Sequence, residues 1–337
     1  MAFCKFFGEC PVCKFQHLPY DDTLRLKAEE VERLFGLKPR IVPSPKDRAY
    51  RSRVIFHLRR PHPTNLIIGY TLERGFVFGV DSCPLLDPAL EELIRPLNGI
   101  LASAPLSVWD VEKGKGKLVS LTLVGDGNGV VLSLNLRKPL FVKRLTFELM
   151  DKLPSVVGVW WSVGTFGEYI TGGRGEMFRT LRRGRYVFKV SPYGDYPDNL
   201  HILSELWRYL EGLLEGRVVA FMTGLHVPPF KMSTYVDLRG MPVREVRETA
   251  EAVGVSPDVR QMEPGAFLLV NPEPYDFAVI HTDRVKDRRV MDVARRTVLI
   301  GESPRRLRDF LTDGKPREML LFDLYPYTDK SLLVALL

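Results

Sequence analysis

The sequence predicts an α+β domain over residues 1–190, followed by an α/β domain with a doubly wound sheet over residues 191–337. Two observations indicate this order. Short apolar runs broken by Gly and Pro recur between residues 50 and 190, which is typical of an antiparallel sheet with helices inserted among its strands. After residue 216, strand-like runs alternate with helical segments, and this alternation favours a mostly parallel sheet covered by helices.

Helical periodicity marks several segments along the chain. Residues 21–36 have apolar side chains spaced for one helical face, and Gly36 stands where a C-cap would be. Further helices are expected at residues 87–103, 140–153, 199–216 and 242–253. Strands are expected in the apolar runs between them, for example "NLIIGYTL" in the first domain and "RVVAFM" in the second.

Composition restricts the class of protein. The chain has 337 residues, of which 45% are hydrophobic and 26% charged, which suffices for one large or two medium cores. No apolar run approaches the roughly 20 residues that span a bilayer, and no continuous apolar segment of a signal peptide opens the chain. A monomeric cytoplasmic protein is therefore expected. The chain contains only two glutamines, and such a low content of thermolabile amide side chains suggests a thermophilic source.

The net charge of +7 is unevenly distributed along the chain. Basic side chains are interleaved with β-type residues at 50–62 and 179–189, and they are dense again at 284–308. Each run alone fits a solvated face as well as a binding surface. Three such runs favour a basic surface that binds the phosphates of a nucleic acid.

Three of the four cysteines lie within the first thirteen residues. Cys4, Cys10 and Cys13 are spaced C-x5-C-x2-C, and Cys83 follows a strand-like run and precedes Pro84. Thiolates cluster in this way around a soft metal or for a reactive role, and a reducing cytoplasm disfavours structural disulfides. The spacing predicts a metal centre bound by these four residues, and it leaves zinc and a [4Fe–4S] cluster equally open.

The residues around the cysteines resemble those of the RNA uracil-C5 methyltransferases that carry an iron–sulfur cluster. That family follows C-x5-C-x2-C with a Gln-His-Leu-x-Tyr stretch, matched at residues 16–20. Its next landmarks are matched by "YRSRV" at 50–54 and "CPLLDP" at 83–88, and "FDLYPYTDKSLLVALL" at 322–337 is similar to its terminal hairpin. The resemblance implies a [4Fe–4S] cluster on the four cysteines, a tRNA or ribosomal RNA partner and a Rossmann-like methyltransferase domain.

The family's catalytic positions are not preserved here. Its chemistry uses a Cys that adds to C6 of uracil, a general base, and a pocket for S-adenosylmethionine. Glu302 stands at the position that matches this Cys, and Leu332 and Pro197 match the base and the uracil-orienting Gln. Only Asn199 remains from the family's Phe-Gln-x-Asn segment, and only Arg284 from its Asp-Pro-Pro-Arg loop. The sequence therefore assigns no catalytic residue.

The crossover that would hold the cofactor is expected to be truncated. About ten residues separate "RVVAFM" from the next strand, and Pro228 and Pro229 disfavour a helix among them. Gly224 alone is no cofactor fingerprint, Asp237 is expected to cap a turn, and His281 is expected to be a hydrogen-bonded structural residue. No cofactor-binding residue is assigned, and S-adenosylmethionine is not expected to bind.

The leading hypothesis is an RNA-binding iron–sulfur protein without methyltransferase activity, which binds tRNA or the ribosome. The alternatives are an active S-adenosylmethionine-dependent RNA uracil-C5 methyltransferase with rearranged residues, and an electron carrier. On a strand, Arg183 and Arg185 share a face. The residues predicted to contact RNA are Arg51, Arg53, Arg59, Arg182, Arg183, Arg185 and Arg284.

Overall fold

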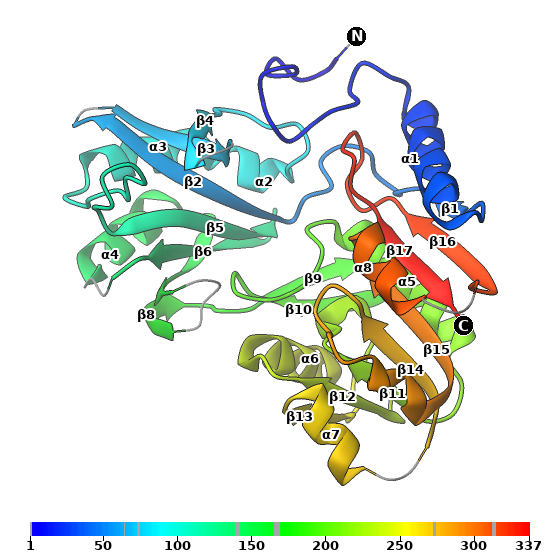
Figure 1. Ribbon diagram of the computed structural model, residues 1–337. Helices are drawn as coiled ribbons and strands as arrows, with labels where there is room; N and C mark the ends of the chain where they lie inside the picture. The colour runs from blue at the N-terminus through cyan, green and yellow to red at the C-terminus, as the bar shows by residue number, and fades with distance from the viewer. Residues whose placement is uncertain are drawn as a thin grey trace. The chain divides into compact units, whose positions relative to one another are not determined.

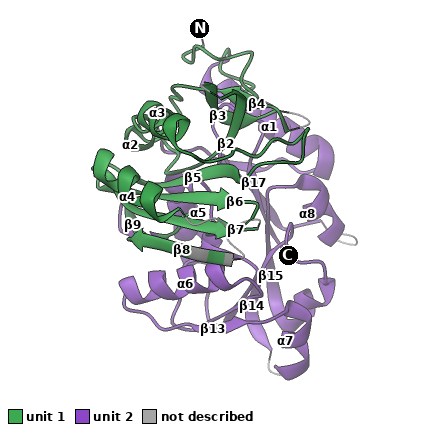
Figure 2. Ribbon diagram, turned by 90° about the vertical axis from the view of Figure 1, so that its left-hand side faces the viewer, with its two compact units in different colours: residues 1–17, 48–181, 190–193 green, residues 18–47, 182–189, 194–337 purple. Residues whose placement is uncertain are grey.

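The computed structural model describes residues 2–63, 65–72, 75–138, 142–164, 169–271, 274–311 and 315–337. The chain forms two compact units (Figure 2). Unit 1 contains residues 1–17, 48–181 and 190–193, and unit 2 contains residues 18–47, 182–189 and 194–337. Residues 18–47 thus join the C-terminal part of the chain rather than the N-terminal domain in which the sequence analysis puts them.

Unit 1 is built on a seven-stranded sheet with the order β4-β3-β2-β5-β6-β7-β8. Neighbouring strands are antiparallel except for β6 and β7, which run parallel. In β2 every second side chain is buried, at Val54, Phe56 and Leu58, as expected for a strand with one face on a core. The strands are β2 (Arg53–His62), β3 (Asn65–Thr71), β4 (Val77–Gly79), β5 (Leu118–Asp126), β6 (Gly129–Leu136), β7 (Val156–Val163) and β8 (Tyr169–Gly175).

Helices connect the strands of unit 1 at the expected places. The segment expected as one helix over 87–103 forms two, α2 (Pro88–Glu91) and α3 (Ile94–Ser103). The Asp87 side chain caps α2, because it accepts a hydrogen bond from the Ala89 N–H at 3.1 Å. Helix α4 (Lys143–Lys152) lies in the connection between β6 and β7, where a parallel pair requires a crossover.

Two glycines of β8 make room for the adjacent tryptophans of β7. Trp160 and Trp161 point to opposite faces of the strand, and Trp160 Nε1 donates a hydrogen bond to the Glu176 carbonyl at 2.8 Å. A Cβ at Gly172 would lie 2.3 Å from Trp161 Cζ2, and one at Gly173 would lie 2.1 Å from Trp160 Cδ2. Since real atoms do not approach so closely, a side chain at either position forces a ring or the strand to move.

We expect Gly172→Ala and Gly173→Ala each to lower the free energy of unfolding by about 1–3 kcal/mol through this overpacking. Gly127→Ala is the matched control, because no atom lies within 4 Å of its Cβ position. Thermal unfolding of the three variants measures the effect. Equal melting of Gly173→Ala and Gly127→Ala would contradict the expectation.

Unit 2 contains an eight-stranded sheet with the order β1-β16-β17-β15-β14-β11-β12-β13. All neighbouring strands are parallel except β17, which is antiparallel to both β15 and β16. Strand β1 lies at the sheet edge beside β16 although the two are far apart in sequence (Figure 1). The strands are β1 (Arg40–Val42), β11 (Val218–Phe221), β12 (Ser233–Asp237), β13 (Asp258–Gln261), β14 (Tyr275–His281), β15 (Ala294–Gly301), β16 (Glu318–Phe322) and β17 (Leu332–Leu336).

Helices of unit 2 pack against this sheet. One core joins Ile280 of β14 with Val31 of α1, Phe267 of α7 and Phe310 of α8. Trp207 of α5 packs against Phe188, with ring centroids 4.5 Å apart. The helices are α1 (Tyr20–Phe35), α5 (Leu200–Leu213), α6 (Gly240–Ala252), α7 (Pro264–Val270), α8 (Pro304–Phe310) and the short 3₁₀ helices η2 (Gly224–His226) and η3 (Arg288–Val293).

A separate hairpin of β9 (Arg179–Arg183) and β10 (Tyr186–Val190) precedes α5. Gly184 has φ +58°, a left-handed conformation that favours glycine, and it forms the turn. Arg183 and Arg185 therefore flank this turn. The expectation that they share one face of a strand is wrong, because the strand ends between them.

Helix α1 is fixed to the C-terminal part of unit 2 by a buried ion pair. Lys27 Nζ donates to Asp323 Oδ1 at 2.5 Å, and also to the carbonyls of Tyr325 and Lys330 at 3.1 and 2.9 Å. The Tyr20 hydroxyl donates to the other carboxylate oxygen of Asp323 at 2.7 Å. The side chains of Lys27 and Asp323 are 4% and 0% exposed, so this contact lies in a low-dielectric interior.

Across the part of the chain that the structure describes, no helix has both the length and the apolar character required to cross a membrane.

Candidate functional site

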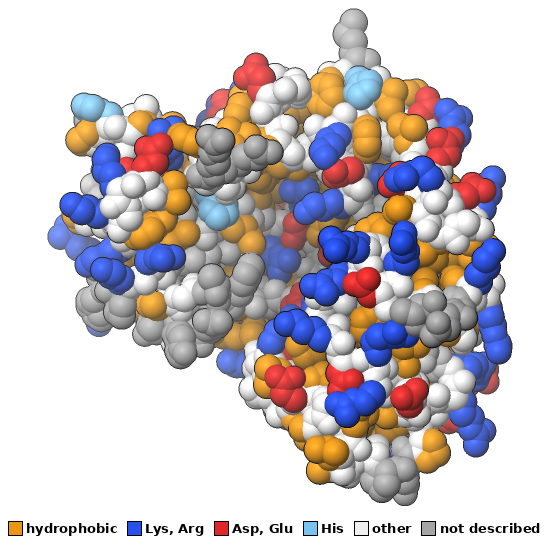
Figure 3. All heavy atoms as spheres, in the orientation of Figure 1, with side chains coloured by type: hydrophobic (Ala, Val, Ile, Leu, Met, Phe, Trp, Pro, Cys, Tyr) orange, Lys and Arg blue, Asp and Glu red, His pale blue; other side chains and the backbone are white. Residues whose placement is uncertain are grey.

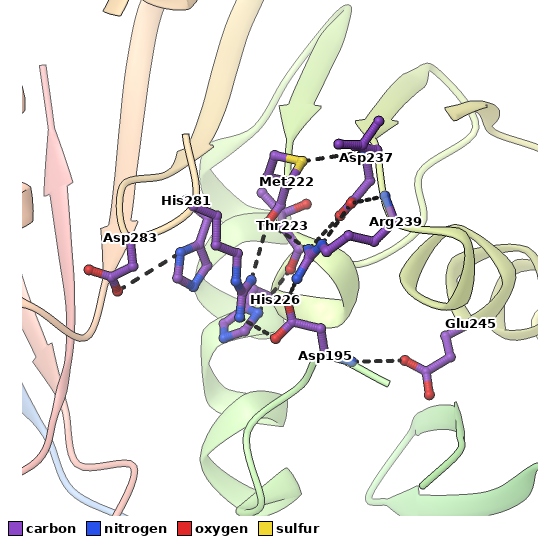
Figure 4. A network of polar contacts seen from close by, with 11 residues as sticks. Asp195, Met222, Thr223, His226, Asp237, Arg239, Glu245, His281 and Asp283 are labelled. Carbon is purple, nitrogen blue, oxygen red and sulfur yellow. Dashed lines mark hydrogen bonds and ion pairs between the residues drawn. The ribbon is translucent and has the colours of Figure 1, made fainter. Parts of the chain in front are cut away.

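The carboxyl ends of three parallel strands lie next to one another in unit 2. Strand β11 pairs with β12 on one side and with β14 on the other. The chain runs from β11 to β12 and β13 in one direction, and from β14 to β15 in the other, so the strand order reverses between β11 and β14. Open α/β sheets bind ligands outside the carboxyl ends of the strands at such a reversal. The residues around these strand ends form the candidate site (Figure 4).

A short turn follows β11. Residues 222–232 lead to β12 and contain only the 3₁₀ helix η2, so the crossover is as short as the sequence analysis expects. Met222 and Gly224 have left-handed φ values of 55° and 51°. Such a φ is uncommon for methionine, and backbone strain of this kind clusters at functional sites. A Cβ at Gly224 would lie 2.6 Å from the Asp195 carbonyl oxygen, which explains the glycine there.

One carboxylate and two guanidinium groups form an ion cluster at these strand ends. Asp195, on the segment that leads into α5, is hydrogen-bonded to Arg239 Nη1 and to Arg284 Nη2. Burial raises the pKa of Asp195, but the charges of Arg284 and Arg239 outweigh it and hold the pKa below its usual value. Both guanidinium groups also donate to the Met222 carbonyl, Arg284 at 3.1 Å and Arg239 at 3.4 Å. The cluster therefore ties Asp195 to the turn after β11.

The last residue of β12, Asp237, is held by Arg239. Asp237 Oδ1 accepts from the Arg239 backbone N–H at 2.9 Å, so the carboxylate caps the turn, as the sequence analysis expects. Its other oxygen accepts from Arg239 Nη2 at 2.6 Å. The space bounded by Asp237, Thr223 and Gly224 is about 10 Å³, which holds no more than one water. The Arg239 side chain thus takes up hydrogen-bonding positions of the Asp237 carboxylate at the strand end.

Two buried histidines lie beside the ion cluster. His226 Nδ1 is 2.9 Å from the Thr223 carbonyl, so Nδ1 carries the proton and Nε2 is an acceptor. The rings of His226 and His281 meet edge to face with centroids 4.9 Å apart. Burial first and then the charge of Arg284 lower both pKa values, that of His226 to about 3 and that of His281 well below its ordinary value. Both imidazoles are therefore neutral at physiological pH.

Three histidine nitrogens and one hydroxyl in this site are buried without a hydrogen-bond partner among the described residues. They are His226 Nε2, His281 Nδ1, His281 Nε2 and Thr223 Oγ1. His281 Nδ1 lies 3.9 Å from Asp283 Oδ2, which is too far for a hydrogen bond. The expectation that His281 is hydrogen-bonded through its ring is therefore not met. Unpaired buried polar atoms gathered at one place are typical of a site that takes a ligand or water.

Two carboxyl groups with raised pKa values lie on the loops after β14 and β15. Asp283 accepts from the backbone N–H of Glu302 at 2.7 Å and from that of Ser303 at 3.3 Å. Burial raises the pKa of both Asp283 and Glu302, although the charge of Arg284 opposes the shift. Glu302, at the position that matches the family's Cys, is therefore a buried carboxyl group whose pKa lies above its usual value.

Asn199 has a structural role in this neighbourhood. It is completely buried, and its Oδ1 accepts from the backbone N–H groups of His201 and Ile202 at the start of α5. Its Nδ2 donates to Ser44 Oγ and to the Leu324 carbonyl. Asn199 therefore joins α5 to two distant segments of unit 2.

The residues predicted to contact RNA fall in different surroundings. Arg51 and Arg53 belong to unit 1, and Arg51 is only 9% exposed. Arg59 is exposed and lies over the Phe76 ring, 5.0 Å from its centroid. The guanidinium of Arg284 is engaged by Asp195. RNA contact by these residues stays a prediction, and the exposed ones are the better candidates.

The remaining predicted RNA-contacting arginines lie in unit 2. Arg182 and Arg185 are exposed at the tip of the β9–β10 hairpin, and Arg183 is half-buried between them. Lys and Arg side chains are spread over much of the surface in Figure 3, with Asp and Glu among them. Three of the sequence-predicted basic residues thus lie beside the turn of one hairpin.

The four cysteines lie in unit 1 and line a cavity of about 10 Å³ together with Phe6, Phe7, Gln16 and Tyr70, among others. Burial raises the pKa values of Cys4 and Cys10, and it raises that of Cys13 to about 12. Cys83 Sγ accepts a hydrogen bond from the Tyr70 hydroxyl at 3.4 Å.

Sequence reasoning missed Asp195, His226 and Arg239. None of the three lies in a family segment or a cysteine motif, and they come together only because the strand ends converge. The one local signal is the glycine before Asp195. A Cβ at Gly194 would lie 1.8 Å from Glu245 Oε1, so the backbone of this loop packs tightly on α6.

Curated relatives of the chain are RNA methyltransferases. The tRNA (uracil(54)-C(5))-methyltransferase of Pyrococcus horikoshii is 27% identical over 241 residues, which are 66% of this chain and 55% of that protein. The protein of the same name from Pyrococcus abyssi is 32% identical over 236 residues, 65% of this chain and 54% of that protein. The matched segments thus span about half the length of these relatives. No family model matches the chain.

A ribosomal RNA enzyme and a solved structure match over nearly the whole chain. The 23S rRNA (uracil(747)-C(5))-methyltransferase of P. abyssi is 23% identical over 96% of this chain and 82% of that protein. The crystal structure of the P. abyssi tRNA (uracil-54, C5)-methyltransferase with S-adenosyl-L-homocysteine has a TM-score of 0.77 at 20% identity, and the match covers 98% of this chain and 86% of that one. This likeness establishes the Rossmann-like methyltransferase fold of the second predicted domain.

The cofactor prediction from the sequence is contradicted. Within the described ranges, no three or more His, Cys, Asp or Glu residues are grouped to hold a metal ion, so the [4Fe–4S] cluster inferred from cysteine spacing and resemblance is not supported. The prediction that S-adenosylmethionine does not bind is overturned as well, because the similar structure carries S-adenosyl-L-homocysteine. The four cysteines do converge on one small cavity of unit 1, and a short crossover does not by itself exclude a cofactor.

The resemblance to RNA uracil-C5 methyltransferases that the sequence motifs indicate is confirmed by these comparisons, whereas the iron–sulfur cluster and the loss of catalytic residues are not shown by them. In sequence and in fold, the chain is a relative of the tRNA and 23S rRNA uracil-C5 methyltransferases.

Proposed function

We propose that this chain is an S-adenosylmethionine-dependent RNA uracil-C5 methyltransferase with rearranged catalytic residues, acting on tRNA or ribosomal RNA. The observation that carries the proposal is the sequence similarity to relatives whose names specify this reaction on both kinds of RNA. The tRNA (uracil(54)-C(5))-methyltransferases of P. horikoshii and P. abyssi are matched over only about half their length, so the substrate is part of the proposal. The ribosome as a partner and the monomeric state stay predictions.

The side chains at the strand ends have the chemical groups that S-adenosylmethionine would require as hydrogen-bond partners. A carboxylate after the second strand of such a sheet is the group that accepts hydrogen bonds from a ribose, and Asp237 stands there. Thr223 Oγ1 and His226 Nε2 are buried without protein partners in the described chain, and they offer further polar contacts. Arg239 must release Asp237 for the ribose to bind, and its side chain is 33% exposed, so solvent is within its reach.

The chemistry requires activation of uracil C5 and removal of its proton. S-adenosylmethionine supplies the methyl group when bound. No cysteine follows Cys83 in the sequence, so unit 2 has no thiolate to add to C6. Glu302 and Asp283 are the carboxyl groups beside the site whose pKa values are raised by burial, and we propose Glu302 as the general base that takes the C5 proton.

Two measurements test the proposal. Calorimetric titration with S-adenosyl-L-homocysteine should detect binding by the wild type, and Asp237→Asn should weaken it by about tenfold or more, because a charge-assisted hydrogen bond to the ribose is lost. Nucleoside mass spectrometry after incubation with S-adenosylmethionine and a tRNA or 23S rRNA transcript should detect 5-methyluridine. Glu302→Gln should abolish this product and leave cofactor binding intact. A wild type that forms no 5-methyluridine on either RNA would contradict the proposal.

One observation favours a second candidate, an RNA-binding protein that does not transfer methyl groups. The Arg239 side chain already pairs with Asp237 and Asp195, so the strand ends are satisfied by the protein's own charges. This candidate predicts tight RNA binding without product in the same mass-spectrometric assay. The two candidates therefore differ in one readout while sharing an RNA partner.

A further inference from the structure

A groove of about 600 Å³ lies on unit 2 between the turn of the β9–β10 hairpin and one face of α5. The hairpin contributes residues 183–186. Helix α5 contributes His201, Ser204, Glu205 and Arg208, which recur three and four residues apart and therefore share one face. Both elements can be found in Figure 1. The groove is far larger than the water-sized space at the strand ends of the same unit.

The lining is basic. Arg183, Arg185 and Arg208 line the groove against a single acidic residue, Glu205. Arg208 Nη1 pairs with Glu205 Oε2 at 2.6 Å, and Arg185 pairs with Glu211 on the next part of α5. The side chains of Arg185 and Arg208 are 70% and 64% exposed, and those of Glu211 and Glu205 are 32% and 22% exposed, so solvent reaches both pairs from the arginine side. Exposed ion pairs contribute little to stability. An arginine can therefore exchange its carboxylate partner for a phosphate with little loss of folding free energy.

His201 reports the positive potential inside the groove. Burial is the main cause that lowers its pKa, the charges of Arg183 and Lys46 act in the same direction, and together they bring the pKa to about 4. The imidazole is therefore neutral at physiological pH, with one nitrogen that donates and one that accepts. Such a group suits a phosphodiester oxygen or a ribose hydroxyl. Because the His201 imidazole carries no charge, it does not compete with the arginines for anionic counterions.

The charges and the size point to one class of ligand. Arginine forks match phosphate oxygens, and a groove of this volume accommodates a nucleotide unit. Tyr186 is buried and packs edge to face on Trp207, so it offers no exposed ring on which a base could stack. We propose that this groove binds the phosphodiester backbone of the RNA partner, without reading its bases. The inference rests on the proposed RNA-binding function and assigns it a site on unit 2.

Fluorescence anisotropy with a labelled tRNA transcript, measured over a range of salt concentrations, tests the site. Relative to wild type, Arg185→Ala/Arg208→Ala should weaken binding about tenfold at low salt, because two phosphate contacts are lost. The same double variant should reduce the slope of log affinity against log salt by about 1.5. Arg33→Ala is the matched control, since Arg33 is 68% exposed and pairs with a glutamate three residues earlier, as Arg208 does.

A second variant, which is expected to strengthen RNA binding, distinguishes a lost contact from a misfolded protein. Glu205→Gln removes the acidic partner of Arg208 and should strengthen tRNA binding about threefold, whereas Glu30→Gln beside Arg33 should not. Free phosphate is the other source of the same chemistry, so inorganic phosphate and uridine monophosphate are titrated in parallel. The groove variants should change tRNA binding much more than binding of either small anion.

The outcomes are distinguishable. If the wild type binds no tRNA or 23S rRNA transcript, the proposed function fails and the inference with it. If the wild type binds RNA but the double variant matches Arg33→Ala and Glu205→Gln matches Glu30→Gln, only the groove assignment is overturned. If the variants alter phosphate binding and leave tRNA binding unchanged, the groove is an anion site and not an RNA site, which also overturns the inference.

Discussion

Lys27→Met is expected to lower the free energy of unfolding by about 3–5 kcal/mol, because it removes one partner of a fully buried ion pair. Asp323 is 0% exposed and would keep its charge with only the Tyr20 hydroxyl as a side-chain partner among the contacts described above. The carbonyls of Tyr325 and Lys330 would also lose the ammonium that they accept from. The cost arises from an uncompensated buried charge rather than from lost packing, since methionine keeps most of the side-chain volume.

Urea unfolding of three variants measures this effect. Arg25→Met is the matched control, because Arg25 lies on the same helix and pairs with Asp22 at an exposed position. Lys27→Met/Asp323→Leu should lose less stability than Lys27→Met alone, since it leaves no unpaired charge. If Lys27→Met and Arg25→Met unfolded at the same urea concentration, the buried pair would not contribute as described.

Acidification from pH 7 to pH 4.5 is expected to lower the free energy of unfolding by about 2.5 kcal/mol through His226 alone. The folded pKa of about 3 lies below the ordinary value of 6.5, so the unfolded chain binds a proton in this window and the folded chain does not. Stability therefore falls as the pH drops below 6.5, and the loss continues until the pH approaches 3. His281, whose pKa is also lowered by burial, adds to the slope.

The slope is measured by urea unfolding at a series of pH values. His226→Asn should flatten it, because the variant has no imidazole to protonate in the unfolded chain. His62→Asn serves as the control, since His62 is exposed. A wild type and a His226→Asn variant with parallel pH dependence would show that the buried pair accepts protons without unfolding.

Local patterns predicted most of the elements. The alternation of Val54, Phe56 and Leu58 identified β2 as a half-buried strand, and the capping positions around residues 21–36 identified α1. The hairpin turn was missed although Gly184 marked it, because the surrounding arginines suggested one continuous strand. The signal was present in that case, and the interpretation was wrong.

The assignment of residues 18–47 to unit 2 could not be read locally. Strand β1 has only three residues, and its partner β16 is specified by a register between Ile41 and Leu321 that no local pattern encodes. The candidate site could not be predicted from local patterns either. Asp195, His226 and Arg239 follow different elements, and only the parallel pairing of β11 with β12 and β14 brings them together. Pairwise contacts between distant segments depend on topology, which periodicity does not determine.

The edge position of β1 also has a consequence for biosynthesis. Residues 40–42 are made long before residues 318–322, which are their neighbours in the sheet. At about 5–20 residues per second, roughly 14–55 s separate the two events. During this interval the apolar face of α1, which includes Val31, has no finished sheet to cover it. The nascent chain thus carries an unpartnered amphipathic helix throughout this interval, and a chaperone that binds such a helix would meet its substrate well before residues 318–322 are made.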